Sequence, residues 1–313
     1  MAYAKMSNKE KLENAAKRLA DQVIESINQG KGATWLKPWH GGGCQNIYSP
    51  KPYSGYNTIW TQIYNAVHGY ESQFFVTANK LFAMAKERKQ RIVIDDPKRL
   101  LTVTFYKPII KNEGEENEEK FFALQTYNVY NVEQVENYKD FFGDDLTKLD
   151  TIEKPQPIFE IDQYFNQYLD NQNISIKFGG ESAAYIPTMD ALRMPKIGQF
   201  VGESEYYSTF AHEVTHTTGP RLGRFKADDP IKFGNDVYSE EELVAEFGAV
   251  MFGQHFNISC DSTLRNSEAY LIGWAKKFKA EPMIILNAIK KASKAFEFVE
   301  NCVAEQSNIK IAA

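Results

Sequence analysis

Three observations predict an α+β protein of two domains: the length, the alternation of helical and strand-type segments, and a change of charge along the chain. The 313 residues are about twice a typical domain of ~150 residues. With 43% hydrophobic and 25% charged residues the chain can build hydrophobic cores, which excludes a wholly disordered protein. The acidic segment 140–157 ends in two prolines, so we place the domains at 1–150 and 151–313.

The N-terminal domain is predicted to be a small antiparallel sheet with flanking helices. Apolar residues recur at helical spacing over 8–28, and the segments 57–68 and 77–89 also have helical patterns. The segments 100–110 and 121–132 are rich in β-branched and aromatic residues, which is typical of strands. The polar, acidic sequence between these two strands is expected to be an exposed hairpin tip.

The C-terminal domain is predicted to place its functional helix beside a short sheet, with a helical lower half. A helix near 158–170 and a strand near 173–178 come first, and 181–195 has the composition of strand and loop. Later helices are expected at four segments: 203–218, 238–256, 264–279 and 283–305. Gly219 and Pro220 are expected to end the first of these four helices.

The sequence HEVTH at 212–216 is an HExxH motif within the helix at 203–218. Its two histidines, His212 and His216, lie on one face of a helix, so both imidazoles can reach one metal ion. Glu213 stands beside them, where a carboxylate can hold and deprotonate a water molecule. About 0.01 such motifs are expected by chance in a chain of this composition, so two unrelated surface or core histidines are the less favoured interpretation.

A zinc ion needs a third protein ligand, because two histidines leave the site incomplete. Leu222 occupies the place of the third histidine in HExxHxxGxxH sequences, which excludes that arrangement. The segment 239–253 carries Glu242 and Glu246 on one face together with small residues, so both carboxylates can approach the histidines. We assign Glu242 as the ligand and Glu246 as the acceptor of a hydrogen bond from a ligating histidine. The reverse assignment stays open, and His255 is a weaker candidate.

These residues, with one zinc ion per chain, predict metal-assisted hydrolysis of a peptide bond. Glu213 is the expected catalytic base, which takes a proton from a water molecule activated by the zinc ion. A second electrophile is also expected, and three tyrosines are candidates for it: Tyr206, Tyr207 and Tyr238. The sequence does not identify the protein that would be cleaved.

The net charge of −5 divides unevenly between the two halves of the chain. Residues 1–111 carry 17 Lys and Arg against 8 Asp and Glu, a net of +9, and residues 112–313 carry the remaining 19 and 33, a net of −14. This asymmetry indicates that the N-terminal half meets a polyanion. Chance clustering of surface charge is the alternative, because no dense run of Lys and Arg occurs.

Aromatic and basic residues are interleaved over 31–60, and a second basic stretch covers 86–99. Unpaired bases stack on aromatic rings while Lys and Arg neutralise phosphates, so this pattern predicts a groove for single-stranded DNA without sequence specificity. The candidate contacts are Trp35, Lys37, Trp39, Lys51, Tyr53, Tyr56, Lys86, Arg88, Lys89 and Arg91. For any single ring among them, packing in a small core is the alternative.

No segment of the sequence has the composition of a membrane span or a secretory signal. The chain contains no run of about 18 apolar residues, and its first residues lack an apolar stretch followed by a cleavage site. The three cysteines, Cys44, Cys260 and Cys302, are scattered and form no CxxC pair, which suits a reducing compartment. We therefore expect a cytoplasmic protein that does not bind membranes.

Short motifs in both halves resemble those of ArdC-type antirestriction proteins. In the C-terminal half, over 185–249, they are MetPro at 194–195, TyrTyr before the HExxH sequence, ThrGly after it, and the block EELVAE. In the N-terminal half they are WLKPW at 35–39, KPYSGYN at 51–57 and YNVYNVEQ at 127–134. The resemblance covers most of the chain.

This resemblance implies a protein of plasmids, phages or integrated mobile elements that shields incoming DNA from restriction. It also implies an N-terminal domain that binds single-stranded DNA and a zincin-like C-terminal domain that holds a metal ion. The order of Glu242 and Glu246 resembles the pattern of thermolysin-like gluzincins, in which the first acid is the ligand.

Three functional hypotheses follow from the sequence. The first joins both halves in an antirestriction protein that binds single-stranded DNA and carries a zinc metallopeptidase site for an unknown protein substrate. The second is a DNA-binding protection module whose metal site is structural or vestigial, against which the intact Glu213 argues. The third is a cytosolic metallopeptidase that does not bind DNA.

Overall fold

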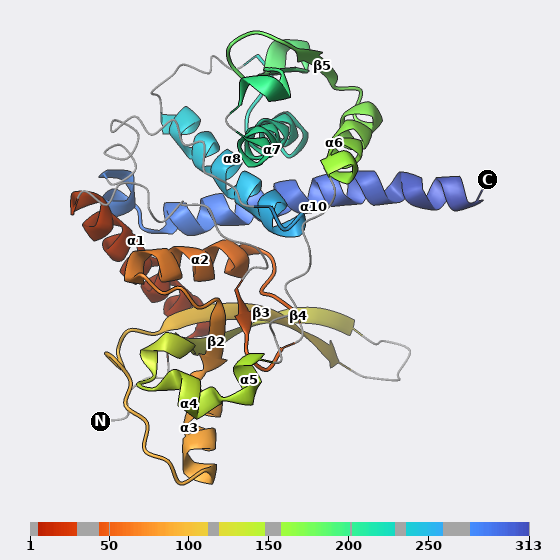
Figure 1. Cartoon of the computed structure of the whole chain (residues 1–313). Coiled ribbons are helices and arrows are strands. Elements are labelled where there is room, and N and C mark those ends of the chain that lie inside the picture. Colours follow the sequence, from red (N-terminus) through yellow and green to blue (C-terminus); the bar gives the residue numbers. More distant parts are fainter. Residues whose placement is uncertain are drawn as a thin grey trace.

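The computed structural model describes residues 6–29, 44–49, 51–111, 119–147, 158–200, 202–228, 236–258 and 276–312. Within them, an N-terminal part is built on a four-stranded sheet and a C-terminal part on long helices with a three-stranded sheet (Figure 1). This arrangement confirms the predicted α+β architecture. The boundary predicted between residues 150 and 151 lies outside the described residues.

The N-terminal sheet has the strand order β1-β2-β4-β3, in which β1 and β2 are parallel and the other neighbours are antiparallel, so the sheet is mixed and not wholly antiparallel as predicted. The two strands predicted from the sequence are the long β3 and β4, whereas β1 and β2 are too short to show an alternating pattern. In chain order the elements are α1 (Asn8–Asn28), β1 (Gln45–Asn46), α2 (Tyr56–His68), β2 (Phe74–Thr77), α3 (Ala78–Glu87), β3 (Leu101–Lys111), β4 (Glu119–Asn131), the short 3-10 helix η2 (Val132–Gln134), α4 (Tyr138–Phe142) and α5 (Asp144–Thr147).

Side chains of α2 cover the open edge of β3. The amide of Asn57 donates to the carbonyl oxygen of Thr104 (2.7 Å) and accepts from the N–H of the same residue (3.1 Å). The indole N–H of Trp60 donates to the carbonyl oxygen of Thr102 (3.0 Å). These bonds satisfy backbone groups that an edge strand otherwise offers to another chain.

The C-terminal sheet has the order β5-β7-β6, with β5 parallel and β6 antiparallel to the central β7. A core that includes Phe165, Phe210, Phe252 and Val299 packs α6, α7, α8 and α10 together. In chain order the elements are α6 (Ile158–Asn171), β5 (Ser175–Phe178), β6 (Ala184–Ile186), the 3-10 helix η3 (Pro187–Met189), β7 (Ala191–Met194), the 3-10 helix η4 (Ile197–Gln199), α7 (Glu203–Arg221), α8 (Asp236–His255) and α10 (Met283–Ala312).

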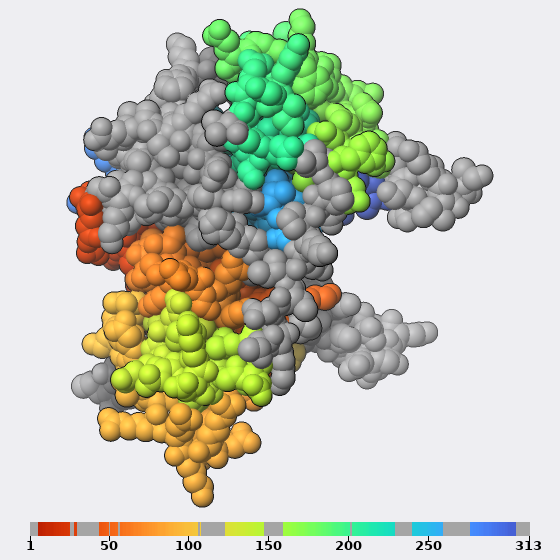
Figure 2. All heavy atoms as spheres, in the orientation of Figure 1, coloured from red at the N-terminus to blue at the C-terminus, as the bar shows by residue number. Residues whose placement is uncertain are grey.

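A single hydrophobic core joins the two parts. Leu19 of α1 and Ile63 of α2 share this core with Phe247 of α8 and Ile289 of α10. Figure 1 shows α10 lying lengthwise between the two parts, and in Figure 2 the light-blue surface of α8 lies between the orange α2 and the green C-terminal part. Separating the parts would expose this apolar surface, so burial holds them together.

The helix that carries the HExxH motif is longer than predicted. It continues to Arg221, so the expectation that Gly219 and Pro220 end it is wrong. Pro220 stands one residue before the end, where its missing N–H costs a single backbone bond. Gly219 is needed for packing instead, because a Cβ there would come within 2.0 Å of the ring of Phe225.

The other predicted helices agree with the structure within a few residues at most of their ends, and α10 runs seven residues beyond its predicted end at 305. Most of the helix expected at 264–279 and residues 112–118 of the hairpin tip expected at 112–120 lie outside the described residues, whereas Glu119 and Lys120 of that tip belong to β4. Among the helices that the structure describes, none is long and apolar enough to cross a membrane.

Candidate metal centre

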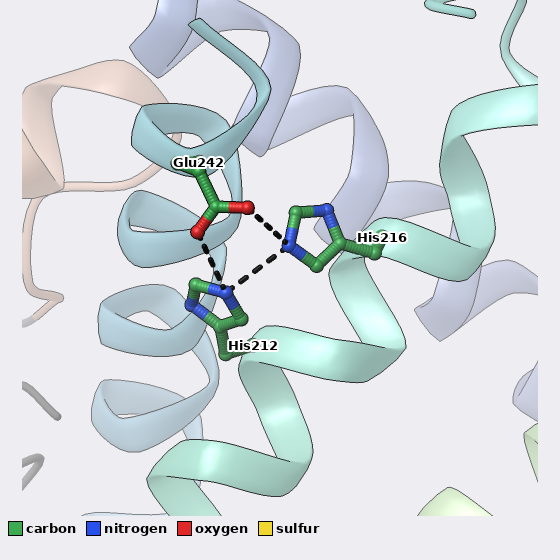
Figure 3. Close-up of side chains that lie close together, drawn as sticks. All are labelled: His212, His216 and Glu242. Carbon is green, nitrogen blue, oxygen red and sulfur yellow. Dashed lines mark hydrogen bonds and ion pairs between the residues drawn. The ribbon is translucent and has the colours of Figure 1, made fainter. Parts of the chain in front are cut away.

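Most residues of α7 are buried, so its polar side chains need partners inside the protein. The hydroxyls of Thr215, Thr217 and Thr218 donate to carbonyl oxygens of the preceding turn over 2.6–2.8 Å. These bonds remove the cost of burying three hydroxyl groups. His212 and His216 leave the helix on the same side, towards α8 (Figure 3).

Small residues allow α8 to approach α7 closely. Gly248 lies against Thr215, and a Cβ at position 248 would come within 2.2 Å of the Thr215 hydroxyl oxygen. Leu243 and Phe247 turn instead to the core shared with the N-terminal part. The close packing at Gly248 brings acidic side chains of α8 to the histidines.

Three donor groups converge between α7 and α8 (Figure 3). The Nε2 atoms of His212 and His216 are 3.1 Å apart. Oε2 of Glu242 lies 3.6 Å from Nε2 of His212, and its Oε1 lies 3.5 Å from Nε2 of His216. Ligand atoms of the three residues all lie within 4.8 Å of one another. Two imidazoles and a carboxylate form a donor set that fits a divalent metal ion such as zinc.

Each of these histidines has a second carboxylate behind it. Nδ1 of His212 is 3.3 Å from Oε1 of Glu246, and Nδ1 of His216 is 3.2 Å from Oε1 of Glu241. A carboxylate in this position orients an imidazole so that its other nitrogen faces a metal ion. The sequence offered Glu246 as such a partner but not Glu241, because the contact between Glu241 and His216 depends on how α7 and α8 pack.

Arg224 holds Glu241 in place. Its guanidinium donates to both carboxylate oxygens of Glu241, over 2.7 and 2.9 Å, and the arginine side chain is 5% exposed. The same guanidinium donates to the hydroxyl of Thr218 and to the carbonyl oxygen of Thr215. The result is a continuous set of contacts from Arg224 through Glu241 to His216. Arg224 has no signal in the sequence, since nothing in its local pattern marks a partner of Glu241.

The carboxylates favour positive charge on the two histidines. Burial lowers the pKa of His216, but hydrogen bonds with Glu241 and Glu242 outweigh burial and raise this pKa to about 9. Burial also opposes protonation of His212, yet Glu246 and Glu242 raise its pKa well above the ordinary value. Burial raises the pKa of Glu242, and the two histidines more than reverse this and lower it. The site therefore favours a positive centre, which a divalent ion supplies when it displaces protons.

Glu213 is 8% exposed and is not one of the three converging groups. Its Oε2 accepts a hydrogen bond of 2.8 Å from the backbone N–H of Tyr185 in β6. The Tyr185 hydroxyl donates to Asp190 (2.8 Å), which pairs with Arg221 at the end of α7 (2.7 Å). These contacts fix β6 against α7 and hold the carboxylate of Glu213 in one orientation.

Other residues proposed for the site lie elsewhere. Tyr206 and Tyr207 are buried in the C-terminal core, with 5% and 1% exposed, so the structure gives both rings a packing role. His255 lies 3.4 Å from Glu300 and contacts the ring of Phe256, apart from the three converging groups. The side chain of Tyr238 is outside the described part of the structure.

The residues proposed to contact DNA fall into three groups. Five cations are exposed, although Arg88 also pairs with Asp145 at 3.6 Å; they are Lys51, Lys86, Arg88, Lys89 and Arg91. Tyr53 is 6% exposed and packs against Phe75, so it is not free to stack on a base. The remaining candidates fall outside what the structure describes: the residues Trp35, Lys37 and Trp39, and the side chain of Tyr56.

Comparison with known proteins identifies a matching family for each part of the chain. Residues 13–130 match the family described as the N-terminal domain of anti-restriction factor ArdC, and residues 163–291 match the zincin-like metallopeptidase family. The fold is similar to that of the antirestriction ArdC protein from the R388 plasmid. The metal-free crystal structure has a TM-score of 0.61 and 24% identity, over 93% of this chain and 98% of that chain. The Mn(II)-bound structure has a TM-score of 0.61 and 25% identity, over 92% and 98%.

Relatives with similar sequences differ greatly in length. The protein y4eC of Sinorhizobium fredii (strain NBRC 101917 / NGR234) is 25% identical over 308 residues, which are 93% of this chain and 92% of that protein. Two proteins named DNA primase TraC from Escherichia coli are 26% and 25% identical, each over 90% of this chain. The chain spans only 19% and 26% of the length of these two proteins.

Proposed function

We propose that this chain is an ArdC-like antirestriction protein that binds single-stranded DNA and hydrolyses a protein at its metal centre, because its two parts match the N-terminal domain of anti-restriction factor ArdC and the zincin-like metallopeptidase family. The N-terminal part would bring the protein to DNA of an incoming mobile element. The metal centre would cleave a protein that is present at this DNA, and this cleavage would shield the DNA from restriction. We place this activity in the cytoplasm.

One observation carries the proposal of hydrolysis. His212, His216 and Glu242 converge on one point, while Glu213 is held separately by the backbone of β6. Glu242 faces Nε2 of both histidines and Glu246 faces only Nδ1 of His212, which supports Glu242 as the third ligand. A purely structural site is closed by its ligands and needs no additional buried carboxylate.

The chemistry of the site follows from these positions. A divalent ion held by the three residues, which we propose is zinc, would supply Lewis-acid activation of water and of a peptide carbonyl. Glu213 would accept a proton from the attacking water and return it to the leaving amine. The Tyr185 N–H bonds one carboxylate oxygen of Glu213, which orients the other for this transfer. The Mn(II)-bound relative makes manganese the metal to compare with zinc.

We propose that the N-terminal part binds single-stranded DNA because it is basic although the whole chain is acidic. Residues 1–111 have a net charge of +9, whereas the whole chain has a net charge of −5. The exposed cations Lys51, Lys86, Lys89 and Arg91 are the proposed phosphate contacts. Contacts of this kind give an affinity that falls steeply with salt and depends little on sequence.

A second candidate function is a DNA-protection module whose metal ion only stabilises the fold. The core shared by both parts favours this candidate, because a metal ion between α7 and α8 would also support the helices packed on α1 and α2. A peptidase that does not bind DNA is the third candidate, and it predicts no salt-dependent binding to single strands.

The variant Glu213→Gln tests the leading proposal against both alternatives. We expect it to retain metal and single-stranded DNA, to lose cleavage of a denatured general substrate by about 10²–10⁴-fold, and to lose protection in a plasmid-transfer assay. Glu203→Gln is the matched control, since Glu203 is exposed on the first turn of the same helix. Full protection by Glu213→Gln would support the module instead. Absence of binding to single strands in the unmodified protein would support the third candidate.

A further inference from the structure

Two aromatic rings on the β3–β4 ribbon are exposed side by side. Phe105 and Tyr127 are each 44% exposed, and their ring centroids are 5.6 Å apart at an angle of 73°. Phe105 pairs with Gln125 and Tyr127 pairs with Val103, so both rings lie on the same face of the ribbon. Exposed apolar groups that adjoin one another mark interaction sites more often than single scattered ones do.

Phe105 and Tyr127 lie next to buried core residues on the same face of the ribbon. Val103 and Val129, each two residues nearer the core on the same face, are completely buried. The centroid of the Tyr53 ring lies 6.3 Å from that of Phe105 and 6.1 Å from that of the buried Phe75. Phe105 is therefore supported by buried rings, and its exposed side has a fixed orientation. In Figure 1 the ribbon extends beyond the helices that cover its other end.

The charge of the ribbon indicates what would cover the rings. The strands β3 and β4, residues 101–111 and 119–131, contain three lysines and one acidic residue, Glu119, in a chain whose net charge is −5. Lys107 is exposed and lies on the same face as Phe105, two residues further along β3. A second copy of this ribbon would carry the same positive charge and be repelled, whereas a polyanion with flat apolar groups would be attracted.

We propose that Phe105 and Tyr127 form a stacking platform for the bases of single-stranded DNA, with Lys107 beside it on a phosphate. This proposal rests on the proposed DNA-binding function. It adds Phe105, Lys107 and Tyr127, which were not among the DNA contacts predicted from the sequence. Rings stack on any base, and a lysine attracts any phosphate, so the platform has no sequence preference. Duplex DNA is excluded because its bases are already stacked and paired.

The test compares two ligands of equal length: a labelled oligothymidine and the corresponding abasic oligomer, which keeps the phosphates and lacks the bases. The double variant Phe105→Thr/Tyr127→Thr keeps strand-forming residues in both positions. We expect it to bind oligothymidine about 10-fold or more weakly and the abasic oligomer unchanged. Tyr127→Phe should bind as the unmodified protein does. Phe159→Ala is the matched control, since Phe159 is 76% exposed on α6 of the acidic half.

Photocrosslinking gives a second measurement, which uses the unmodified protein and therefore does not depend on whether a variant folds. An oligonucleotide with 5-iodouracil should crosslink to peptides that contain Phe105 or Tyr127 in the unmodified chain. Equal binding of oligothymidine by the double variant and the unmodified protein, or crosslinks confined to other segments, would overturn the platform and leave the proposed DNA binding intact. Failure of the unmodified protein to bind oligothymidine would overturn both. A change of oligomeric state in the double variant, with unchanged DNA affinity, would assign the rings to a self-contact instead.

Discussion

The metal centre and the exposed end of the β3–β4 ribbon hold their side chains in opposite ways. At the metal centre His212, His216 and Glu242 have only 12–19% of their side chains exposed, and further carboxylates and Arg224 support them. On the ribbon Phe105 and Tyr127 are 44% exposed and are supported by other rings. A small ion requires donors in fixed directions, whereas a flexible polymer requires only flat surfaces and diffuse charge. Burial therefore supports the proposed metal centre, and exposure supports the proposed stacking platform.

Removal of a proposed metal ligand should produce the largest effect, and this effect should be confined to the metal centre and leave the ribbon unchanged. His212→Ala and Glu242→Ala should reduce the metal content of the purified protein from about one ion per chain to none, because each removes one of the three proposed ligands. Glu246→Ala should keep the ion with about 10–100-fold weaker affinity. Metal analysis of the three variants beside His255→Ala measures this. Loss of metal in Glu246→Ala with retention in Glu242→Ala would reverse the assignment of the two acids.

The pH should affect the two sites differently. Without metal, His216 has a pKa of about 9 and holds a proton below that pH, whereas a ligand must be neutral. Metal affinity should therefore fall as the pH falls below about 9, by about tenfold per pH unit for each proton displaced. Titration of metal at several pH values, together with measurement of released protons, checks the sign. Binding of oligothymidine should change far less over the same range, because lysines remain charged.

Arg224→Met should affect both the stability of the protein and its metal affinity. It leaves the carboxylate of Glu241 buried without its cation, which costs about 3–5 kcal/mol when a buried pair is broken. It also frees Glu241 to shift away from His216, so metal affinity should fall about 10–100-fold. Arg221→Met is the matched control, because its partner Asp190 touches none of the proposed ligands. Calorimetric unfolding and metal titration of both variants separate the two effects.

Gly248→Ala tests whether close packing of α7 and α8 holds the donors together. A Cβ at this position would approach the Thr215 hydroxyl to 2.2 Å, so the helices must move apart, at a cost of about 1–3 kcal/mol in the free energy of unfolding. Metal affinity should fall with it, because Glu242 moves away from the histidines. Gly198→Ala is the control, since its Cβ would meet no atom within 4 Å. Unchanged metal affinity in Gly248→Ala would show that the donors tolerate a wider spacing.

Lys107→Gln should have the smallest effect and should be confined to the ribbon. It removes one proposed phosphate contact, so the slope of log affinity for oligothymidine against log salt should decrease by about 0.7, the value for one contact on a single strand. The abasic oligomer should lose affinity to the same extent, and metal content should not change. A slope identical to that of the unmodified protein would place Lys107 away from the DNA.

The sequence predicted the fold best where neighbours along the chain decide the structure. It predicted the helices α1, α2, α6 and α8 and the long strands β3 and β4, because each has many residues of one periodicity. It missed β1 and β2, which are two and four residues long and exist through pairing with distant segments. It ended α7 too early, because Gly219 is required by contact with Phe225 and not as a helix end.

The sequence by itself determined that His212, Glu213 and His216 share one turn of helix, since helix geometry places residues four apart on one face. It also determined the uneven charge and the presence of two acids on one face of α8. Only the tertiary structure decided that Glu241 rather than Glu246 supports His216, that Arg224 holds Glu241, and that Phe105 meets Tyr127 above the buried Tyr53. These contacts join residues far apart along the chain, and their partners depend on how helices and strands pack, which local periodicity does not encode.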